Sequence, residues 1–312
     1  MKTWEKVREN PGLLGKYLVR EKVIDAIRAF FKKEGFREVE TPILVPVPSS
    51  EANLEVMETE LRTASGKKRR AFLILSPEYS LKKLVAAGIG KVFEITKCFR
   101  NEEEVSALHN PEFTMLEWYR VGADYTKIME DFERLFIEIV GSKKLNYQGE
   151  AYDLSRPWPR LSCRELGLGE LSEGEFYKKF FNEVEPKLMA SRRPAFVYDY
   201  PVAQAALARK KAGDPRFAER WEVFLAGLEL GNCFSELTDA AEQKSRLEAD
   251  LVERRGKGKT NYPLDEDFIG AVGKMPETAG IAVGVDRLVM LAADASTISE
   301  TLWFPADELF DL

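Results

Sequence analysis

Apolar and polar positions along the chain predict a succession of helices and strands. Apolar residues recur at helical spacing over residues 18–34, and Gly35 is placed to end that helix. Residues 36–40 then alternate like a strand, which Thr41 and Pro42 bring to an end. The pattern therefore begins with one amphipathic helix followed by one strand.

The remaining pattern predicts more elements without a regular repeat of strand, helix and strand. Strands are expected at residues 71–75, 92–99, 112–119, 195–200 and 281–285, and as a pair around Gly227 within residues 221–237. Helices are expected from Ser76-Pro77-Glu78 onward and at residues 126–140, 241–255 and 286–293. Residues 141–193 mix short helical patches with Pro, Gly and Ser, which indicates a variable helical insertion. The predicted fold class is α+β, a mainly antiparallel sheet flanked by helices, in a single domain over residues 1–312.

The composition is that of a globular protein with an acidic balance. Hydrophobic residues make up 45% of the chain and the formal net charge is −6, so a bulk basic surface for nucleic acid is not expected. No apolar run of membrane-spanning length occurs, and residues 1–10 lack the apolar core of a signal peptide. The cytoplasm is therefore the expected compartment.

Cysteine and histidine usage excludes several classes of site. The cysteines Cys98, Cys163 and Cys233 are far apart and form no CxxC pair, which argues against a disulfide framework and a thiolate zinc site. His109 is the only histidine, so a site that needs two histidines is excluded. The densest basic cluster, residues 67–70, follows a turn signal and is expected at an exposed hairpin tip, with contact to an acidic partner as the alternative.

The first cluster that could carry chemistry spans residues 99–103 and 109–113. Arg100 offers the planar fork that matches a phosphate or a carboxylate, and Phe113 could stack on a base. A strand edge, a polar loop and a returning strand could hold a nucleotide between them. The alternative is a surface hairpin with solvated charges.

The second cluster places four polar side chains among apolar neighbours, namely Glu222, Glu229, Asn232 and Glu236. Carboxylates beside Val, Phe and Leu are costly unless they pair with a cation or a metal. A turn near Gly227 would bring Glu222 and Glu229 together across a hairpin, where two carboxylates and phosphate oxygens could hold Mg²⁺. The alternative is a solvent-facing row of acids on an amphipathic strand.

The third cluster is residues 280–288, with Gly280 and Gly284 four positions apart on a predicted strand. Glycine lets a backbone or ligand approach closely, and Arg287 at a helix start is well placed for a phosphate. In the alternative interpretation the strand is simply buried, Asp286 caps the helix, and Arg287 pairs with it.

Together the three clusters resemble the class II aminoacyl-tRNA synthetases, and within them the lysyl subgroup. Residues 35–42 resemble motif 1 of that family, residues 99–102 with 109–119 resemble motif 2, and residues 280–291 resemble motif 3. The resemblance implies the class II catalytic core, activation of an amino acid with ATP and Mg²⁺, and a homodimer.

Among lysyl-type cores the chain looks like the stand-alone paralogues that attach (R)-β-lysine to a lysine of translation elongation factor P. Motif 1 begins near the start of the sequence, so no anticodon-binding domain is expected. Ala282 stands where these ligases have alanine and lysyl-tRNA synthetases have glycine. Two features depart from the ligases: the loop between Glu103 and His109 is one residue longer, and Cys233 replaces a glycine expected close to the substrate pocket.

The resemblance implies a role for each candidate residue. Residues that would bind ATP are Arg100, Glu102, His109, Phe113, Glu229 and Arg287, of which Arg100 and Arg287 would be catalytic. Mg²⁺ would be held by Glu222 and Glu229. Lysine or (R)-β-lysine would be bound by Glu78, Glu117, Tyr119, Asn232, Glu236 and Ala282.

Three functions are compatible with these residues. The leading interpretation is activation of lysine or (R)-β-lysine and its transfer to elongation factor P. The first alternative is a minimal lysyl-tRNA synthetase, which the acidic balance and the expected absence of an anticodon-binding domain disfavour. The second is a non-catalytic paralogue that binds lysine or nucleotide, which the presence of Arg100, Glu222, Glu229 and Arg287 disfavours.

Overall fold

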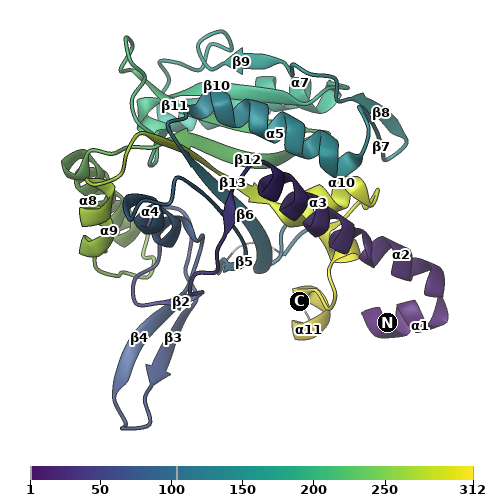
Figure 1. Cartoon of the computed structure of the whole chain (residues 1–312), viewed down its shortest axis with the longest axis horizontal. Helices are drawn as coiled ribbons and strands as arrows, with labels where there is room; N and C mark the ends of the chain where they lie inside the picture. Colours follow the sequence, from purple (N-terminus) through teal and green to yellow (C-terminus); the bar gives the residue numbers. More distant parts are fainter. Residues whose placement is uncertain (1, 103–104, 312) are drawn as a thin grey trace.

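The computed structural model describes residues 2–102 and 105–311, so Glu103 of the first cluster and part of the lengthened loop lie outside the described residues. A large sheet forms the centre of the molecule, with strand order β1-β5-β6-β13-β12-β11-β10-β9 (Figure 1). Its strands are β1 (Arg37–Glu38), β5 (Lys91–Phe99), β6 (Glu112–Val121), β9 (Arg160–Ser162), β10 (Ala195–Pro201), β11 (Phe217–Leu225), β12 (Leu228–Ser235) and β13 (Thr278–Gly284). The β1–β5 and β9–β10 pairs are parallel, and the other pairs are antiparallel. The predicted α+β class is confirmed.

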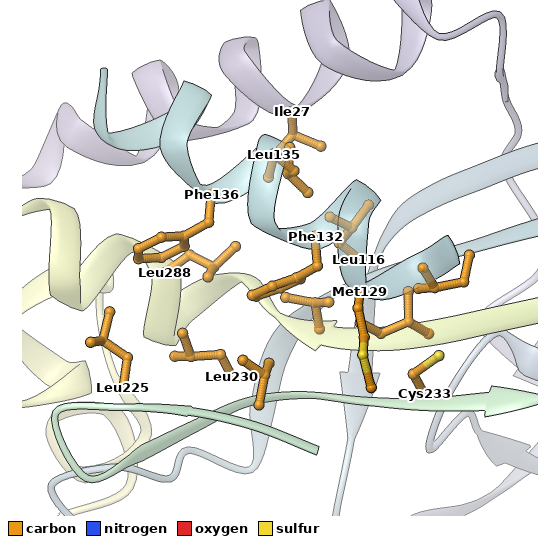
Figure 2. Close-up of a cluster of buried hydrophobic side chains, with 14 of the residues drawn as sticks. Ile27, Leu116, Met129, Phe132, Leu135, Phe136, Leu225, Leu230, Cys233 and Leu288 are labelled. Carbon is orange, nitrogen blue, oxygen red and sulfur yellow. The ribbon is translucent and has the colours of Figure 1, made fainter. Parts of the chain in front are cut away.

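One face of this sheet is covered by three helices, α3 (Val19–Lys33), α5 (Tyr125–Val140) and α10 (Val285–Ala292). Successive strand residues point to opposite faces, so alternate positions such as Leu116 and Trp118 of β6 join the apolar core beneath these helices. Figure 2 shows Phe132 and Phe136 reaching from α5 toward the strands. The helix predicted over residues 18–34 is confirmed as α3.

The opposite face is only partly covered, by α4 (Glu78–Ala86), α8 (Ala240–Gly256) and α9 (Glu266–Val272). These helices pack together at one end of the sheet (Figure 1), with Tyr79 stacked on Phe268 at 3.6 Å between ring centroids. The sequence pattern predicted α4 and α8 and missed α9. The uncovered part of this face is left open for a cleft.

Residues 141–193 are not mainly helical, so the expectation of a helical insertion is wrong for their first half. That half forms β7 (Lys144–Tyr147), β8 (Glu150–Asp153) and β9, and β9 pairs with β10 as the edge of the large sheet. The second half is helical, with α6 (Glu173–Lys179), a π-helical turn (Phe180–Val184) and α7 (Glu185–Ala190). Apolar side chains of both halves share one cluster with β10, which makes the segment part of the core.

A separate small sheet carries the basic cluster. It has the order β2-β4-β3, where β2 is Leu44–Val45, β3 is Glu58–Arg62 and β4 is Lys68–Leu73. The hairpin of β3 and β4 projects away from the body of the molecule (Figure 1). Lys67 to Arg70 lie at its exposed end, which confirms the predicted hairpin tip.

Short helices connect the larger elements and bring the two ends of the chain together (Figure 1). They are α1 (Thr3–Glu9), η1 (Pro11–Leu13), α2 (Leu14–Tyr17), η3 (Val202–Gln204), η4 (Ile298–Thr301) and α11 (Ala306–Phe310). The Thr3 amide donates to a Glu308 carboxylate oxygen at 2.7 Å, which ties α1 to α11. None of the helices in residues 2–102 and 105–311 combines the length and the apolar character needed to cross a bilayer.

A buried carboxylate joins three elements that lie far apart in the sequence. Asp286 in α10 accepts a hydrogen bond from the Thr114 amide of β6 at 2.6 Å and forms an ion pair with Arg20 of α3. Helix α10 begins at Val285 with Gly284 before it, so Asp286 does not cap the helix. The guanidinium of Arg287 instead bonds Glu229 and His109, so the alternative pairing of Arg287 with Asp286 is wrong.

We expect Asp286→Ala to lower the free energy of unfolding by about 3 kcal/mol, because it leaves the Arg20 guanidinium and the Thr114 amide without their buried acceptor. Urea unfolding followed by circular dichroism measures this loss. Glu38→Ala is the control, since it removes an exposed partner of Arg28 and should cost less than about 1 kcal/mol. Equal losses of unfolding free energy in the two variants would contradict the importance assigned to Asp286 in joining α10, α3 and β6.

Candidate active site

A cleft of about 480 Å³ lies on the sheet face opposite α3 and α5. Its floor is made by β6, β12 and β13, and α4, the end of β5 and α10 supply its walls. Predicted site residues that line it are Glu78, Arg100, His109, Phe113, Glu117, Tyr119, Glu229, Asn232, Glu236, Ala282 and Arg287. Glu102 and Glu222 do not line it.

The register of β11 and β12 decides which residues face the cleft. Val223 pairs with Gly231 and Phe224 with Glu229, so Leu230 is an extra residue on β12. This β-bulge resets the alternation of side chains, since one added residue turns the following positions to the other face. Glu229 before the bulge and Asn232 after it therefore both line the cleft, although they are three residues apart.

The same bulge turns Cys233 away from the cleft. Cys233 is fully buried in the apolar core with Met129 of α5 (Figure 2). It therefore lies on the opposite side of the sheet from Asn232, which lines the cleft. The expectation that Cys233 lies at the substrate pocket is therefore wrong, because its side chain points into the core. A strand without the bulge would have pointed this side chain into the cleft. Cys98 and Cys163 are also buried, and all three are free thiols.

One end of the cleft is built from carboxylates. Glu117 accepts hydrogen bonds from the Ser76 hydroxyl at 2.5 Å and the Tyr119 hydroxyl at 3.0 Å. Burial, and then the charge of Glu78, raise the pKa of Glu117 well above its usual range. Burial raises the pKa of Glu236 to about 7, with Glu78 acting in the same direction. This end of the cleft therefore favours cationic groups, which would relieve the repulsion among the carboxylates.

A buried lysine lies behind these carboxylates. The Lys82 Nζ atom is 2.6 Å from a carboxylate oxygen of Glu78 and 2.6 Å from one of Glu236. Burial alone would lower the pKa of Lys82, but the attraction of Glu236 and Glu78 outweighs burial and raises it. Lys82 is therefore an ammonium ion held inside the protein.

Strand β13 leaves room above the carboxylates. A Cβ atom on Gly280 would lie 2.3 Å from the Tyr119 ring and 2.7 Å from a Glu236 oxygen, so only glycine fits there. Ala282, two residues along, adds one methyl group to the floor between Glu117 and Asn232, with which it pairs across the sheet. The cleft-facing side of β13 thus shapes the pocket with almost no side-chain volume.

The other end of the cleft is cationic and aromatic. Arg287 donates to the Glu229 carbonyl at 2.7 Å, and its second terminal nitrogen lies 3.0 Å from His109 Nε2. The Ser106 hydroxyl is 3.1 Å from His109 Nδ1 and fixes the ring from the other side. The Arg100 guanidinium lies over the Phe113 ring, 5.0 Å from its centroid. These groups can hold an anion beside a flat ring system.

Of the two proposed metal ligands, Glu229 lines the cleft and Glu222 lies on the neighbouring strand β11. Glu222 is opposite Asn232 across the β11–β12 ladder, and its carboxylate accepts hydrogen bonds from Arg220 at 2.5 Å and from the Tyr200 hydroxyl at 2.6 Å. Burial, and then the charge of Glu222, raise the pKa of Glu229. Two neighbouring carboxylates with this repulsion fit Mg²⁺ as hard oxygen ligands.

The metal site would not be made by the protein alone. Within residues 2–102 and 105–311, no three acidic, histidine or cysteine side chains gather as a ready-made cation site. Remaining ligands would have to come from phosphate and water oxygens. Glu102 lies apart from the cleft, with its exposed carboxylate 3.7 Å from Lys259 Nζ, and its predicted contact with ATP stays a prediction.

Comparison with known proteins places the chain in a family. Residues 6–308 match the class II tRNA synthetases (D, K and N). The chain belongs to this family. It is 36% identical to the elongation factor P–(R)-β-lysine ligase of Proteus mirabilis over 307 residues, which cover 92% of this chain and 94% of that protein. It is 37% identical to the corresponding ligase of Vibrio cholerae over 305 residues.

Lysine–tRNA ligases are similar to the same degree. That of Pelotomaculum thermopropionicum is 37% identical over 338 residues, which cover 95% of this chain and 64% of that protein. That of Moorella thermoacetica is 36% identical, with 66% of its length covered. The chain thus spans about two thirds of the length of these synthetases. These similarities show the family, and the relatives' names include both a protein and a tRNA as the acceptor of the amino acid.

Two cations at the site, Lys82 and Arg220, were not among the residues predicted from the sequence. Lys82 follows Glu78 by four residues, a spacing at which opposite charges meet on one helix face, and this signal was available. Arg220 lies two residues before Glu222 on β11 and bonds both Glu222 and the Asn232 side chain, the latter at 3.2 Å. Its role depends on the pairing of β11 with β12, which a single sequence does not specify.

We expect a glutamate carboxyl that titrates near pH 7, because the pKa of Glu236 is raised from 4.5 to about 7. A folded-state pKa above the unfolded value means that this group lowers stability as pH rises from about 4.5 to 7. ¹³C-carboxyl NMR of glutamate-labelled protein measures the titration.

In Glu236→Gln this titration should vanish, and the fall in unfolding free energy over the same pH range should shrink by more than about 1 kcal/mol. Glu277→Gln is the control, because that side chain is 82% exposed. A signal near pH 7 that persists in Glu236→Gln would contradict the assignment.

Proposed function

We propose that the protein is an ATP-dependent, AMP-forming ligase that activates (R)-β-lysine or lysine and transfers it to a lysine side chain of translation elongation factor P. One observation carries the proposal: buried carboxylates at one end of a single cleft face an arginine, histidine and phenylalanine group at the other. A diamino acid fits the carboxylate end, and a nucleoside triphosphate fits the end with the arginines, the histidine and the phenylalanine. The reaction would take place in the cytoplasm.

In the first step the substrate carboxylate attacks the α-phosphorus of ATP and pyrophosphate leaves. The carboxylate is already ionised at neutral pH, so this step needs no general base. Arg100 and Arg287 would hold the phosphates and neutralise charge as it develops, while Phe113 would stack on the adenine. Asn232 would position the attacking carboxylate. Glu222 and Glu229 would hold Mg²⁺, which supplies further charge neutralisation when bound.

Substrate choice follows from charge. The substrate presents two ammonium groups, and we assign its backbone amino group to Glu78 and its distal ammonium to Glu117, Tyr119 and Glu236. An apolar amino acid would leave part of this carboxylate cluster unpaired in a buried site, which is a strong basis for rejection. Ala282 reshapes the floor by one methyl group, which supports a preference for the β-amino isomer.

In the second step an amine of the acceptor attacks the carbonyl carbon of the adenylate and AMP leaves. A lysine side chain has an ordinary pKa of about 10.4, so it must first lose a proton. A carboxylate of the cleft or the departing phosphate of AMP would accept that proton. The name and the similarity of the Proteus mirabilis ligase support elongation factor P as the acceptor.

Lysine tRNA is the second candidate acceptor, because the similarity to lysine–tRNA ligases is equally high. The two acceptors share the activation step and differ only after it. We favour the protein acceptor because of Ala282, which corresponds to the alanine of the ligases.

Competition between acceptors tests the proposal. We expect labelled (R)-β-lysine, supplied with ATP and Mg²⁺ to the protein together with elongation factor P and lysine tRNA, to appear on elongation factor P and more strongly than labelled lysine. Gel filtration of the products locates the label, and pyrophosphate exchange measures activation by itself. Label on tRNA would instead identify a minimal synthetase, and a lack of exchange with either amino acid would refute the activation step.

The proposal includes a homodimer. Exposed apolar side chains lie at both ends of α2 and directly after residues 35–42, namely Leu14, Leu18, Ile43 and Leu44, and exposed apolar side chains of this size are typical of contact surfaces. We expect sedimentation velocity at micromolar concentration to give the mass of two chains. Ile43→Asp should shift the equilibrium toward the monomer, and a wild-type protein that sediments as a monomer would refute the dimer.

A further inference from the structure

Lys82 occupies a place in the fold that stability alone does not explain. It follows Glu78 by one turn of α4, its side chain has no exposed surface, and it does not line the cleft. Its ammonium is in contact with Glu78 and Glu236, two of the carboxylates assigned to the ammonium groups of the substrate. It therefore reaches the substrate site from behind, through the groups that would bind the substrate.

A buried ammonium is a costly way to fill this space. Removing a cation from water is unfavourable, and well-packed apolar residues often replace buried ion pairs without loss of stability. What an apolar side chain cannot do is hold two carboxylates near one another and favour their ionised forms. Glu78 and Glu236 each have an oxygen 2.6 Å from the same nitrogen, so without Lys82 they would repel each other across a short gap.

The charges at the carboxylate end of the cleft determine how many positive charges a ligand must bring. Burial raises the pKa of Glu117 and Glu236, and a bound cation favours their ionised forms. With all three carboxyls ionised, Glu78, Glu117 and Glu236 supply three negative charges, and the hydroxyl groups that bond Glu117 are neutral. Lys82 supplies one positive charge from inside the protein. Two negative charges therefore remain for the ligand, which equals the number of ammonium groups on a diamino acid.

We propose that Lys82 is a positioning residue that makes the cleft selective for diamino acids, by fixing the carboxylates of Glu78 and Glu236 and compensating one of the three negative charges. This inference rests on the proposed activation of lysine or (R)-β-lysine. Lys82 acts through the two glutamates and takes no part in the bond-making steps. The Lys82 ammonium thus supplies, from the protein itself, one of the three positive charges that balance the three carboxylates.

The groups around Glu236 give the inference a measurable consequence. Glu236 is faced by Lys82 and Glu78 from α4, by Glu117 and Tyr119 from β6, and by the backbone of Gly280 from β13. Lys82 is the cation among these groups, and its charge favours the ionised form of Glu236. Because a substrate ammonium needs that form, loss of Lys82 should move the pH dependence of substrate use toward alkaline pH.

Lysine-dependent pyrophosphate exchange by the full chain, between about pH 6 and pH 9, tests this. For Lys82→Met we expect kcat/KM for lysine to fall about tenfold or more at neutral pH, with its pH midpoint raised by about one unit or more. The KM for ATP should stay within about twofold, since the ATP end of the cleft is unchanged. Lys83→Met is the matched control: it removes the same charge from the next position of α4, where Lys83 pairs with Asp265 and Asp267 outside the cleft.

Each outcome decides the question. Wild-type protein without exchange with either lysine or (R)-β-lysine would refute the proposed function, whereas wild-type exchange with equal pH midpoints in Lys82→Met and Lys83→Met would refute only the role of Lys82. If Lys82→Met does not fold, Lys82→Gln replaces it, because the amide can still donate a hydrogen bond but carries no charge. Failure of both variants to fold would also overturn the inference, because Lys82 would then serve stability and not selection.

Discussion

The extra residue on β12 is the constraint on which the site depends. Strand side chains alternate between a core covered by α3 and α5 and a cleft on the other face, so each position serves one side only. Leu230 breaks this alternation once, and the break turns Asn232 and Phe234 into the cleft and Cys233 into the core. A regular hairpin would place a thiol among the carboxylates and bury an amide in the core, which is unfavourable at both places.

The cleft separates opposite charges, and this separation would orient the substrate of the proposed reaction. Carboxylates gather where α4 meets β6, and Arg287 and His109 gather where α10 meets the connection between β5 and β6. A ligand with ammonium groups at one end and a reactive carboxylate near the other can lie in only one orientation. Asp286 makes this arrangement rigid, since it ties α10 to both α3 and β6. The proposed chemistry would therefore rely on prearranged charge more than on any single reactive side chain.

Local patterns predicted much of this structure, and contacts between distant residues account for the rest. Helix α3 and the hairpin around Gly227 follow from periodicity and turn chemistry, which neighbouring residues determine. The bulge at Leu230 and the position of β9 at the sheet edge depend on partner strands far away in the sequence. The carboxylates and arginines of the site were found from their residue types and their resemblance to a family. Lys82 was missed because a lysine on a helix is ordinarily solvated.

The two faces of β13 serve different purposes. Residues on one face maintain the fold, and small residues on the other face shape the pocket. Ile281 and Val283 hold the core from one side of the strand, while Gly280 and Ala282 form the pocket from the other. A mutation at Ala282 changes the space in the pocket by one or two atoms and leaves the core beneath α3 and α5 intact, although Ala282 also packs against the small cluster of Ile74, Cys98 and Met115. Lineages with this scaffold could thus exchange one amino acid isomer for another through single, nearly neutral steps. Gly280 limits that freedom, because any larger residue there meets the Tyr119 ring.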